Sequence, residues 1–547
     1  MATIGMLHEL EATTDVVAGR NVAVSQLLLA LAGLSERHDY RIYVPDRQQR
    51  TLEQRLPSPR IRVHGRRELA ESVPVAAWHD NQFDTYLPFA IRAKHGGSYP
   101  VTCTHHTLSY PGLLHDSLLR LLLAGTAGYD ALICTSAAAA RALRELIAHV
   151  TEGMAVHGAK LGFRGRLVTI PLGVDTDRFH PVDRGAARAR FQLPGDAFVV
   201  LWVGRLSAID KADLLPVVGM FARLRAERAT AHPLLVCAGT QHAGERHGEV
   251  IQAYARALGI DDAVRVITQR EQFMPWLPLL YSAADVFISP IDNVQETFGL
   301  TPVEAMACGV PAVVSDWNGY RETVVDGVTG YLVPTLWGGP EGIADVTDGS
   351  LYQEPAYDHL ALAQCVAVDL AALGAAIRRL MDDPTLRRRL GEQARAHVLE
   401  RFSWHAVVRA YEALWHELGQ EAAAQPEIPA DLCAYSRPDY ARAFGHYASS
   451  ELAPDCQLGL TAAGRALAQG DGLLPSHHNA AWSYLDLTLV RRLLAGLATL
   501  DAQGHYLTVE QAASVMARGG HDRWIATRIR RHLMWLIKYD YVRPVAR

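Results

Sequence analysis

Cysteine is scarce in this sequence, and the few cysteines are scattered. The 547 residues hold seven of them, an odd number without a CxxC pair. They are Cys103, Cys134, Cys237, Cys308, Cys365, Cys433 and Cys456. This pattern argues against a disulfide framework and against a thiolate metal site. We expect buried thiols in a reducing cytoplasm.

Long apolar runs and a strong net charge are missing too. No stretch approaches the roughly 20 apolar residues that cross a bilayer, and the N-terminus lacks the basic-then-apolar pattern of a signal peptide. The formal net charge is only −5, which indicates no polyanionic partner, so we expect no binding to nucleic acid. The composition therefore predicts a cytoplasmic globular protein.

The order of apolar runs predicts an α/β fold with parallel sheets. A chain of 547 residues exceeds what one hydrophobic core supports, and short apolar runs alternate with helical patterns as βα units require. The runs of a first sheet are "YRIYVP" from Tyr40, "VTCTHH" from Val101, "ALICTS" from Ala131 and "LVTIPLG" from Leu167. Those of a second sheet are "FVVLWVG" from Phe198, "PLLVCAG" from Pro233, "AVRVIT" from Ala263, "DVFISP" from Asp285 and "VPAVVSD" from Val310.

Composition also marks the breaks between regions. A polar, arginine-rich segment separates the two series of strands and puts a boundary near residue 185. The stretch from Thr335 to Asp358 is rich in Gly, Pro and Asp without periodicity, which predicts an inserted loop. "AAAQPEIPADL" from Ala422 is typical of a linker, and the residues after it lack βα alternation.

Two carboxylates, Glu296 and Glu304, stand eight positions apart around a Phe-Gly turn. Thr301 can cap a helix, Pro302 suits its first position, and Glu304 falls three residues after the cap, which predicts a capping box. In the alternative interpretation, the turn from Phe298 to Thr301 offers free amides to a diphosphate. Glu304 would then reach a ribose diol, and Glu296 a second polyhydroxylated ring.

Here the sequence resembles a known family. The spacing Glu296-x7-Glu304, followed by "EAMACGVPAVVSDWNGYRETVVDGVTGYLVP", resembles the donor-site signature of the retaining GT-B glycosyltransferases of family 4. The resemblance covers most of residues 1–420. "IPLGVDTDRFHP" from Ile170 is similar to the segment that leaves the first domain of that family. "VGRLSAIDK" from Val203 resembles its phosphate clamp, and "RFSW" from Arg401 its return to the first domain.

The resemblance implies the GT-B fold, two Rossmann-like parallel-sheet domains that face a cleft. On this basis residues 1–185 form an N-terminal acceptor-side domain, and residues 186–402 a domain that binds the nucleotide sugar. Residues 403–421 form a crossover helix back to the first domain. Residues 422–547 hold a linker and an appended, mostly helical domain.

The resemblance also implies roles for single residues. Arg205 and Lys211 would grip the donor diphosphate and neutralise the leaving group. Glu304 would bind the ribose, and Glu296 the hydroxyls of the transferred sugar. The rest of this donor-binding loop consists of Thr297, Phe298, Gly299 and Leu300, of which the last three would offer backbone amides.

Two positions in the first domain complete the implied donor site. Gly19 in "VVAGRNVAVSQ" would let a loop approach the phosphates, although the family usually has two adjacent glycines where this chain has Ala18-Gly19-Arg20. "TCTHHTLSYPG" supplies His105 and His106 after a predicted strand. We select His106 as the catalytic histidine and assign His105 to donor binding, while a structural role for either histidine stays open.

No metal is expected in this reaction. No DxD-like motif stands where a divalent ion would bridge the diphosphate, and no His/Asp/Glu cluster has ligand spacing. The predicted catalytic residues are therefore His106, Glu296, Arg205 and Lys211. The resemblance implies front-face transfer from a nucleoside diphosphate sugar to an unidentified acceptor, with retained anomeric configuration and no cofactor.

Two further regions are open to more than one interpretation. The stretch from Arg37 to Arg67 holds nine arginines, which suits either a solvated helix face or peripheral contact with an anionic membrane. The C-terminal stretch from Leu507 has a helix cap at Thr508, a break at Gly519-Gly520 and then an amphipathic helix. This order superficially resembles a winged helix-turn-helix, but we favour acceptor recognition or docking of a protein partner over DNA binding.

Other function classes stay open at this point. A sugar phosphorylase or a nucleotide-sugar epimerase can use the same architecture. A regulator without catalysis could bind a sugar nucleotide and act on partners through residues 425–547.

Overall fold

The computed structural model describes most of the chain as two compact units, Met1–Arg437 and Pro438–Arg547. The described residues are 2–9, 19–35, 37–70, 74–81, 86–110, 112–209, 211–228, 232–242, 244–350, 352, 355–430, 439–471, 485–517 and 525–545.

The first sheet has seven parallel strands in the order β3-β2-β1-β4-β5-β6-β7. Its strands are β1 (Ala2–Leu7), β2 (His38–Val44), β3 (Ile61–Gly65), β4 (Ala77–Asp80), β5 (Val101–His105), β6 (Ala131–Cys134) and β7 (Arg166–Thr169). The accompanying α-helices are α1 (Gly19–Leu34), α2 (Gln49–Arg55), α3 (Leu87–His95), α4 (Leu119–Leu123) and α5 (Ala137–Val156). The four runs predicted for this sheet are confirmed as β2, β5, β6 and β7.

Both faces of the first sheet are buried, as its apolar runs predict. On β6, Ala131 and Ile133 belong to one core cluster, while Leu132 and Cys134 belong to another. Successive side chains of a strand point to opposite faces, so the two clusters mark the two sides of the sheet. This burial explains why the strand reads as an unbroken apolar run.

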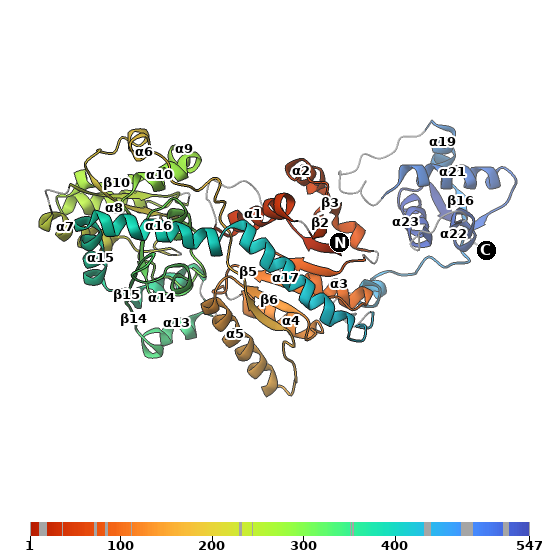
Figure 1. Ribbon diagram of the computed structural model, residues 1–547. Coiled ribbons are helices and arrows are strands. Elements are labelled where there is room, and N and C mark those ends of the chain that lie inside the picture. Colours follow the sequence, from red (N-terminus) through yellow and green to blue (C-terminus); the bar gives the residue numbers. More distant parts are fainter. Residues whose placement is uncertain are drawn as a thin grey trace. The chain divides into compact units, whose positions relative to one another are not determined.

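The second sheet repeats the same strand order in six parallel strands, β10-β9-β8-β11-β12-β13. Its strands are β8 (Phe198–Val203), β9 (Pro233–Ala238), β10 (Val264–Ile267), β11 (Val286–Ser289), β12 (Ala312–Ser315) and β13 (Gly330–Val333). Its α-helices are α6 (Arg184–Arg190), α7 (Leu215–Glu227), α8 (His247–Ala257), α9 (Arg270–Phe273), α10 (Leu277–Ala283), α11 (Leu300–Ala307), α12 (Tyr320–Thr323), α15 (Leu370–Asp382) and α16 (Pro384–Arg401). All five predicted runs are strands. The expected pair of Rossmann-like domains is therefore confirmed (Figure 1).

The prediction of a plain loop from Thr335 to Asp358 is wrong. The region holds β14 (Thr335–Trp337), α13 (Ala344–Gly349) and the start of α14 (Pro355–Gln364), and β14 pairs in antiparallel register with β15 (Val366–Val368). Strands of three residues and a helix of six are too short to produce a clear periodic pattern, so composition alone dominated the prediction.

After α16 the chain returns to the first domain. Helix α17 (Trp404–Ala423) begins directly after Ser403, whose hydroxyl accepts a hydrogen bond from Ala406 N. Figure 1 shows α17 lying along the first domain. Its buried face joins the core on one side of the first sheet through Trp404, Val407, Val408, Tyr411, Leu414, Trp415 and Leu418.

The C-terminal unit is mostly helical around a small antiparallel sheet of order β17-β16-β18. Its elements are α18 (Tyr440–Phe444), β16 (Gln457–Leu460), α19 (Ala462–Gln469), α21 (Leu487–Asp501), β17 (Leu507–Thr508), α22 (Val509–Ala517), α23 (Ile525–Lys538) and β18 (Val542–Pro544). The predicted cap at Thr508 is confirmed, because its hydroxyl accepts from Gln511 N at 3.1 Å. The predicted break at Gly519-Gly520 lies outside the described residues.

Four of the predicted buried thiols are buried, namely Cys103, Cys134, Cys237 and Cys308. Cys365 and Cys456 are half-buried instead, and Cys433 lies outside the described residues. All six described cysteines are free thiols. Among the described residues, no helix combines the length and hydropathy that crossing a membrane requires.

The nine arginines from Arg37 to Arg67 are not gathered on one helix face. They are distributed over β2, α2, β3 and their connections. Several are paired with carboxylates, among them Arg67 with Asp46 at 2.7 Å and Arg66 with Glu9 at 3.4 Å. Such pairing lowers the charge that this surface could offer to a membrane.

Candidate functional site

A cavity of about 470 Å³ lies at the carboxyl ends of β8, β9 and β11. Open parallel sheets place ligands at this edge. The second domain supplies most of the lining. Residues 1–185 add Gln26, His106, Thr107, Tyr110, Leu172, Arg178 and Phe179. The cavity is therefore built by both domains.

Most of the predicted site residues line this cavity. They are His106, Arg205, Lys211, Glu296, Thr297, Phe298, Gly299, Leu300 and Glu304. One predicted residue whose surroundings are described, His105, is not among its lining. Gly19 is the first residue of α1, and the loop before it lies outside the described residues.

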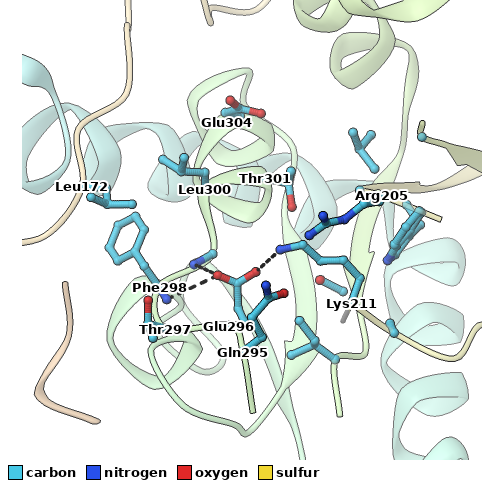
Figure 2. A pocket seen from close by; sticks show the side chains of 18 of the residues that line it. Leu172, Arg205, Lys211, Gln295, Glu296, Thr297, Phe298, Leu300, Thr301 and Glu304 are labelled. Atoms are coloured by element: carbon cyan, nitrogen blue, oxygen red, sulfur yellow. Dashed lines mark hydrogen bonds and ion pairs between the residues drawn. The ribbon is translucent and has the colours of Figure 1, made fainter. Parts of the chain in front are cut away.

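The carboxylate of Glu296 accepts three hydrogen bonds within the site. One carboxylate oxygen lies 2.9 Å from Lys211 Nζ, and the other accepts from Gly299 N at 3.0 Å and from Phe298 N at 3.5 Å. Figure 2 shows this carboxylate between the ammonium group and the loop amides. Glu296 thus accepts from two of the three amides that the family resemblance assigns to the donor.

The surroundings of Glu296 favour its ionised form. Burial acts to raise the pKa of the Glu296 carboxyl, but the Lys211 ammonium and the two amides outweigh it and hold the pKa below its ordinary value. An ionised Glu296 can only accept hydrogen bonds, as binding of sugar hydroxyls requires.

The predicted capping box at Thr301 is wrong. Helix α11 begins at Leu300, and its N-cap is Gly299 with φ +93°, without a side-chain cap. Only glycine adopts this left-handed conformation readily, which explains the Phe-Gly turn. Because the helix starts before Thr301, the side chain of Glu304 is free for another contact.

That contact is a buried hydrogen bond. Tyr281 Oη donates to the Glu304 carboxylate at 2.7 Å, and Glu304 is 9% exposed. Burial raises the pKa of the Glu304 carboxyl to about 7, against the opposing effects of Tyr281 and of the Arg178 charge. The two carboxylates of the motif therefore have opposite electrostatic surroundings.

Arg205 and Lys211 belong to the connection that follows β8. Figure 2 shows both side chains on the same side of the cavity. Arg205 Nη1 lies 3.4 Å from His242 Nε2. Two cations near the amino end of α11 make this part of the cavity suited to an anion.

The two neighbouring histidines differ in position. His105 is the last residue of β5 and is 4% exposed, and burial lowers the pKa of its imidazole to about 4. His106 lines the cavity, and its Nε2 lies 3.2 Å from Asn81 Oδ1. Only His106 is thus in a position to meet a ligand in this cavity.

Arg178 is a lining residue that the sequence analysis did not single out. Its guanidinium donates to the Met274 carbonyl at 3.4 Å and lies 5.0 Å from the centre of the Phe179 ring. The residue sits inside "IPLGVDTDRFHP", which was singled out only as a segment similar to the one that leaves the first domain of the family. Tyr110 and Gln295 were also missed, although Gln295 Nε2 donates to Tyr110 Oη at 2.9 Å.

Metal binding has no visible basis in the described part of the chain. There, no group of three or more His, Cys, Asp or Glu side chains is arranged to hold an ion. The expectation of metal-independent chemistry stays a prediction.

Part of the chain is similar to known glycosyltransferase sequences. Residues 183–345 match the family described as "Glycosyl transferases group 1". The chain is 32% identical over 251 residues to a D-inositol 3-phosphate glycosyltransferase from Streptomyces avermitilis, covering 45% of this chain and 46% of that one. It is 38% identical over 173 residues to D-inositol 3-phosphate glycosyltransferase 2 from Catenulispora acidiphila, covering 31% and 39%. The aligned part is thus less than half the length of either relative.

Solved structures agree on the fold. Sucrose-phosphate synthase from Thermosynechococcus elongatus superposes with a TM-score of 0.51 at 22% identity, over 77% of this chain and all of that one. Anabaena HepE in complex with UDP gives a TM-score of 0.51 at 17% identity, over 76% of this chain and all of that one. The fold is GT-B, as the resemblance implied, with an appended helical region at the C-terminus.

Proposed function

We propose that this chain is a retaining glycosyltransferase that moves a sugar from a nucleoside diphosphate donor to an acceptor without a metal ion. The observation that carries the proposal is the cavity between the two domains, which Arg205 and Lys211 line together with two glutamates. The pKa of Glu296 is lowered there, and that of Glu304 is raised. The cavity's volume of about 470 Å³ is within the range of small-molecule sites.

In this proposal each side chain acts on one part of the donor. Arg205 and Lys211 bind the diphosphate, and their charge stabilises it as the bond to the sugar breaks. Glu304 accepts the ribose hydroxyls, and Glu296 those of the transferred sugar. Because Lys211 is paired with Glu296 at 2.9 Å, donor binding would place the ammonium between the carboxylate and a phosphate.

His106 completes the proposed site from the first domain. A neutral imidazole or a nearby carbonyl would stabilise positive charge on the sugar ring. The acceptor oxygen attacks the anomeric carbon from the face that the diphosphate leaves. The acceptor proton passes to the leaving phosphate oxygen, so the anomeric configuration is kept.

Nucleotide binding is the first test. A thermal-shift panel of UDP, GDP, ADP and their sugars should reveal the donor, because a ligand at 100 times its dissociation constant adds about 2.7 kcal/mol of stability. UDP is the first choice, since HepE, which shares the fold, was solved with UDP. No shift with any nucleotide sugar would contradict the proposal.

Arg205→Ala tests the leaving-group contact. Removing such a charge-assisted contact costs on the order of 100-fold in turnover, so a change of less than about threefold would contradict the assigned role. Arg256→Ala is the control, because Arg256 is an exposed arginine of the same domain that is not among the cavity's lining residues.

A second assay tests the alternative function. Release of a sugar phosphate in the absence of nucleotide would indicate a phosphorylase instead of a glycosyltransferase.

Other parts of the proposal extend beyond the cavity. We assign the protein to the cytoplasm and place its domain boundaries near residues 185, 402 and 421. The acceptor stays unassigned, and the C-terminal unit is proposed as a module for the acceptor or for a protein partner.

A further inference from the structure

A carboxylate of the second domain binds the amino end of a helix of the first. Glu322 on α12 accepts hydrogen bonds from Ala137 N at 2.7 and 2.9 Å, one to each oxygen, and from Ala138 N at 3.2 Å. These are the first amides of α5, a helix of 20 residues. Amides at this position have no partner inside the helix, and the helix dipole favours an anion there.

The same helix end also contacts the loop that carries Glu296. Ser136 caps α5 by accepting from Ala139 N at 3.0 Å, and its hydroxyl donates to the Thr297 carbonyl at 2.7 Å. Thr297 Oγ1 in turn donates to the His106 carbonyl at 3.0 Å. Ser136 has 0% exposure. One connected set of hydrogen bonds thus joins Glu322, α5, the Glu296 loop and His106.

We infer that Glu322 is a positioning residue that holds the two domains together, so that His106 and Glu296 share one cavity. Glu322 is not itself among the residues that line the cavity. The contact of Glu322 with α5 is partly exposed to solvent, where an ion pair of two flexible side chains would contribute little. Here, however, a charged acceptor meets fixed backbone donors, and hydrogen bonds to charged groups are the stronger ones.

Hydrogen–deuterium exchange on the full chain tests the contact without donor or acceptor. Glu322→Gln should speed exchange at Ala137 and Ala138 by roughly tenfold. It should also speed exchange at Phe298 and Gly299, whose amides donate to Glu296. Exchange that changes only within the second domain, or does not change at all, would overturn the inference.

Two further variants make the result specific. Glu341→Gln removes one exposed charge from the insertion of the same domain and should leave both regions unchanged. Ser136→Ala removes the hydrogen bond to Thr297 and should reproduce the faster exchange at Phe298 and Gly299. If Ser136→Ala leaves this loop protected, the proposed connection through α5 is wrong.

The consequence for catalysis rests on the proposed function. Arg205 and Lys211 both belong to the second domain, so Glu322→Gln should change nucleotide affinity by less than about threefold. Turnover should fall by about tenfold or more, because the first-domain half of the site is no longer held in place. A variant with full turnover would overturn the inference. A wild-type chain that binds no nucleotide sugar would instead overturn the proposed function and leave the exchange result standing.

Discussion

Glu296 and Glu304 share one short motif but meet different surroundings. Lys211 and two amides outweigh burial at Glu296, whereas Tyr281 and the Arg178 charge do not outweigh it at Glu304. Environments that separate the pKa values of two carboxyl groups commonly assign them different tasks. Glu296 is thus ionised and able to accept hydrogen bonds from hydroxyls, while Glu304 loses its proton near neutrality.

The raised pKa of Glu304 predicts a pH-dependent stability. Between its ordinary value of 4.5 and about 7, the unfolded chain ionises this group while the folded chain stays protonated, so stability is lost as pH rises through the folded pKa. Glu304→Gln abolishes this effect. At pH 8 we expect the variant to be more stable than wild type by on the order of 1–3 kcal/mol, and at pH 4 to show no such gain.

Thermal unfolding between pH 4 and pH 8 checks this prediction. Glu400→Gln, which changes an exposed carboxylate on α16, should follow the wild-type curve. A Glu304→Gln curve parallel to wild type over the whole range would show that the pKa of Glu304 is not raised.

At the scale of elements, the start of α11 depends on Gly299. Its φ of +93° disfavours any side chain, and a Cβ there would run into the Tyr320 ring. We expect Gly299→Ala to destabilise the second domain by about 3 kcal/mol or more and to abolish nucleotide binding. Urea unfolding and the nucleotide thermal shift measure the two effects.

Gly327→Ala separates backbone strain from the clash. Gly327 also has positive φ, +69°, but a Cβ there would meet no atom within 4 Å. Its substitution should cost only about 1 kcal/mol and leave nucleotide binding intact. Equal losses for the two variants would mean that contact with Tyr320 plays no part.

Long buried elements were predictable from the sequence, and short local features were not. Every apolar run named for the two sheets is a strand, because burial on both faces imposes a strong signal on most of them, although not on β7. The strands β1, β3, β4 and β13 were not named. The cap of α11 was misplaced by two residues because Gly299 takes the N-cap in a conformation that only glycine enters easily. The antiparallel pair β14 and β15 was missed, since three residues carry no measurable periodicity.

The candidate site was predicted through its motif, and the missed parts depend on distant contacts. Nine residues chosen from the sequence line one cavity. Tyr110 and Gln295 were not chosen, because their contact joins positions 185 residues apart. Arg178 was not chosen either, and its contact with Met274 joins positions 96 residues apart. Nothing in the local sequence marks such a pair. Likewise, the contact of Glu322 with α5 joins two domains and has no local pattern.

For the whole molecule, the division into two units predicts independent folding. Pro438–Arg547 has its own core, which includes Leu458, Leu493, Ile529 and Leu533. We therefore expect this unit alone to unfold cooperatively on heating, as circular dichroism would show. A chain of residues 1–437 should keep the nucleotide thermal shift of the full chain to within about 1 °C. Loss of that shift would place part of the donor site in the C-terminal unit.

The return of α17 to the first sheet has a consequence for biosynthesis. The last strand of that sheet ends at Thr169, but the helix that closes one of its faces spans Trp404–Ala423. A ribosome adding roughly 5–20 residues per second needs on the order of 10–50 s to make the intervening chain. During that interval the second domain can complete its sheet, while the part of the first domain's core that α17 covers stays open. We therefore expect the domain that is translated first to be the later of the two to finish folding.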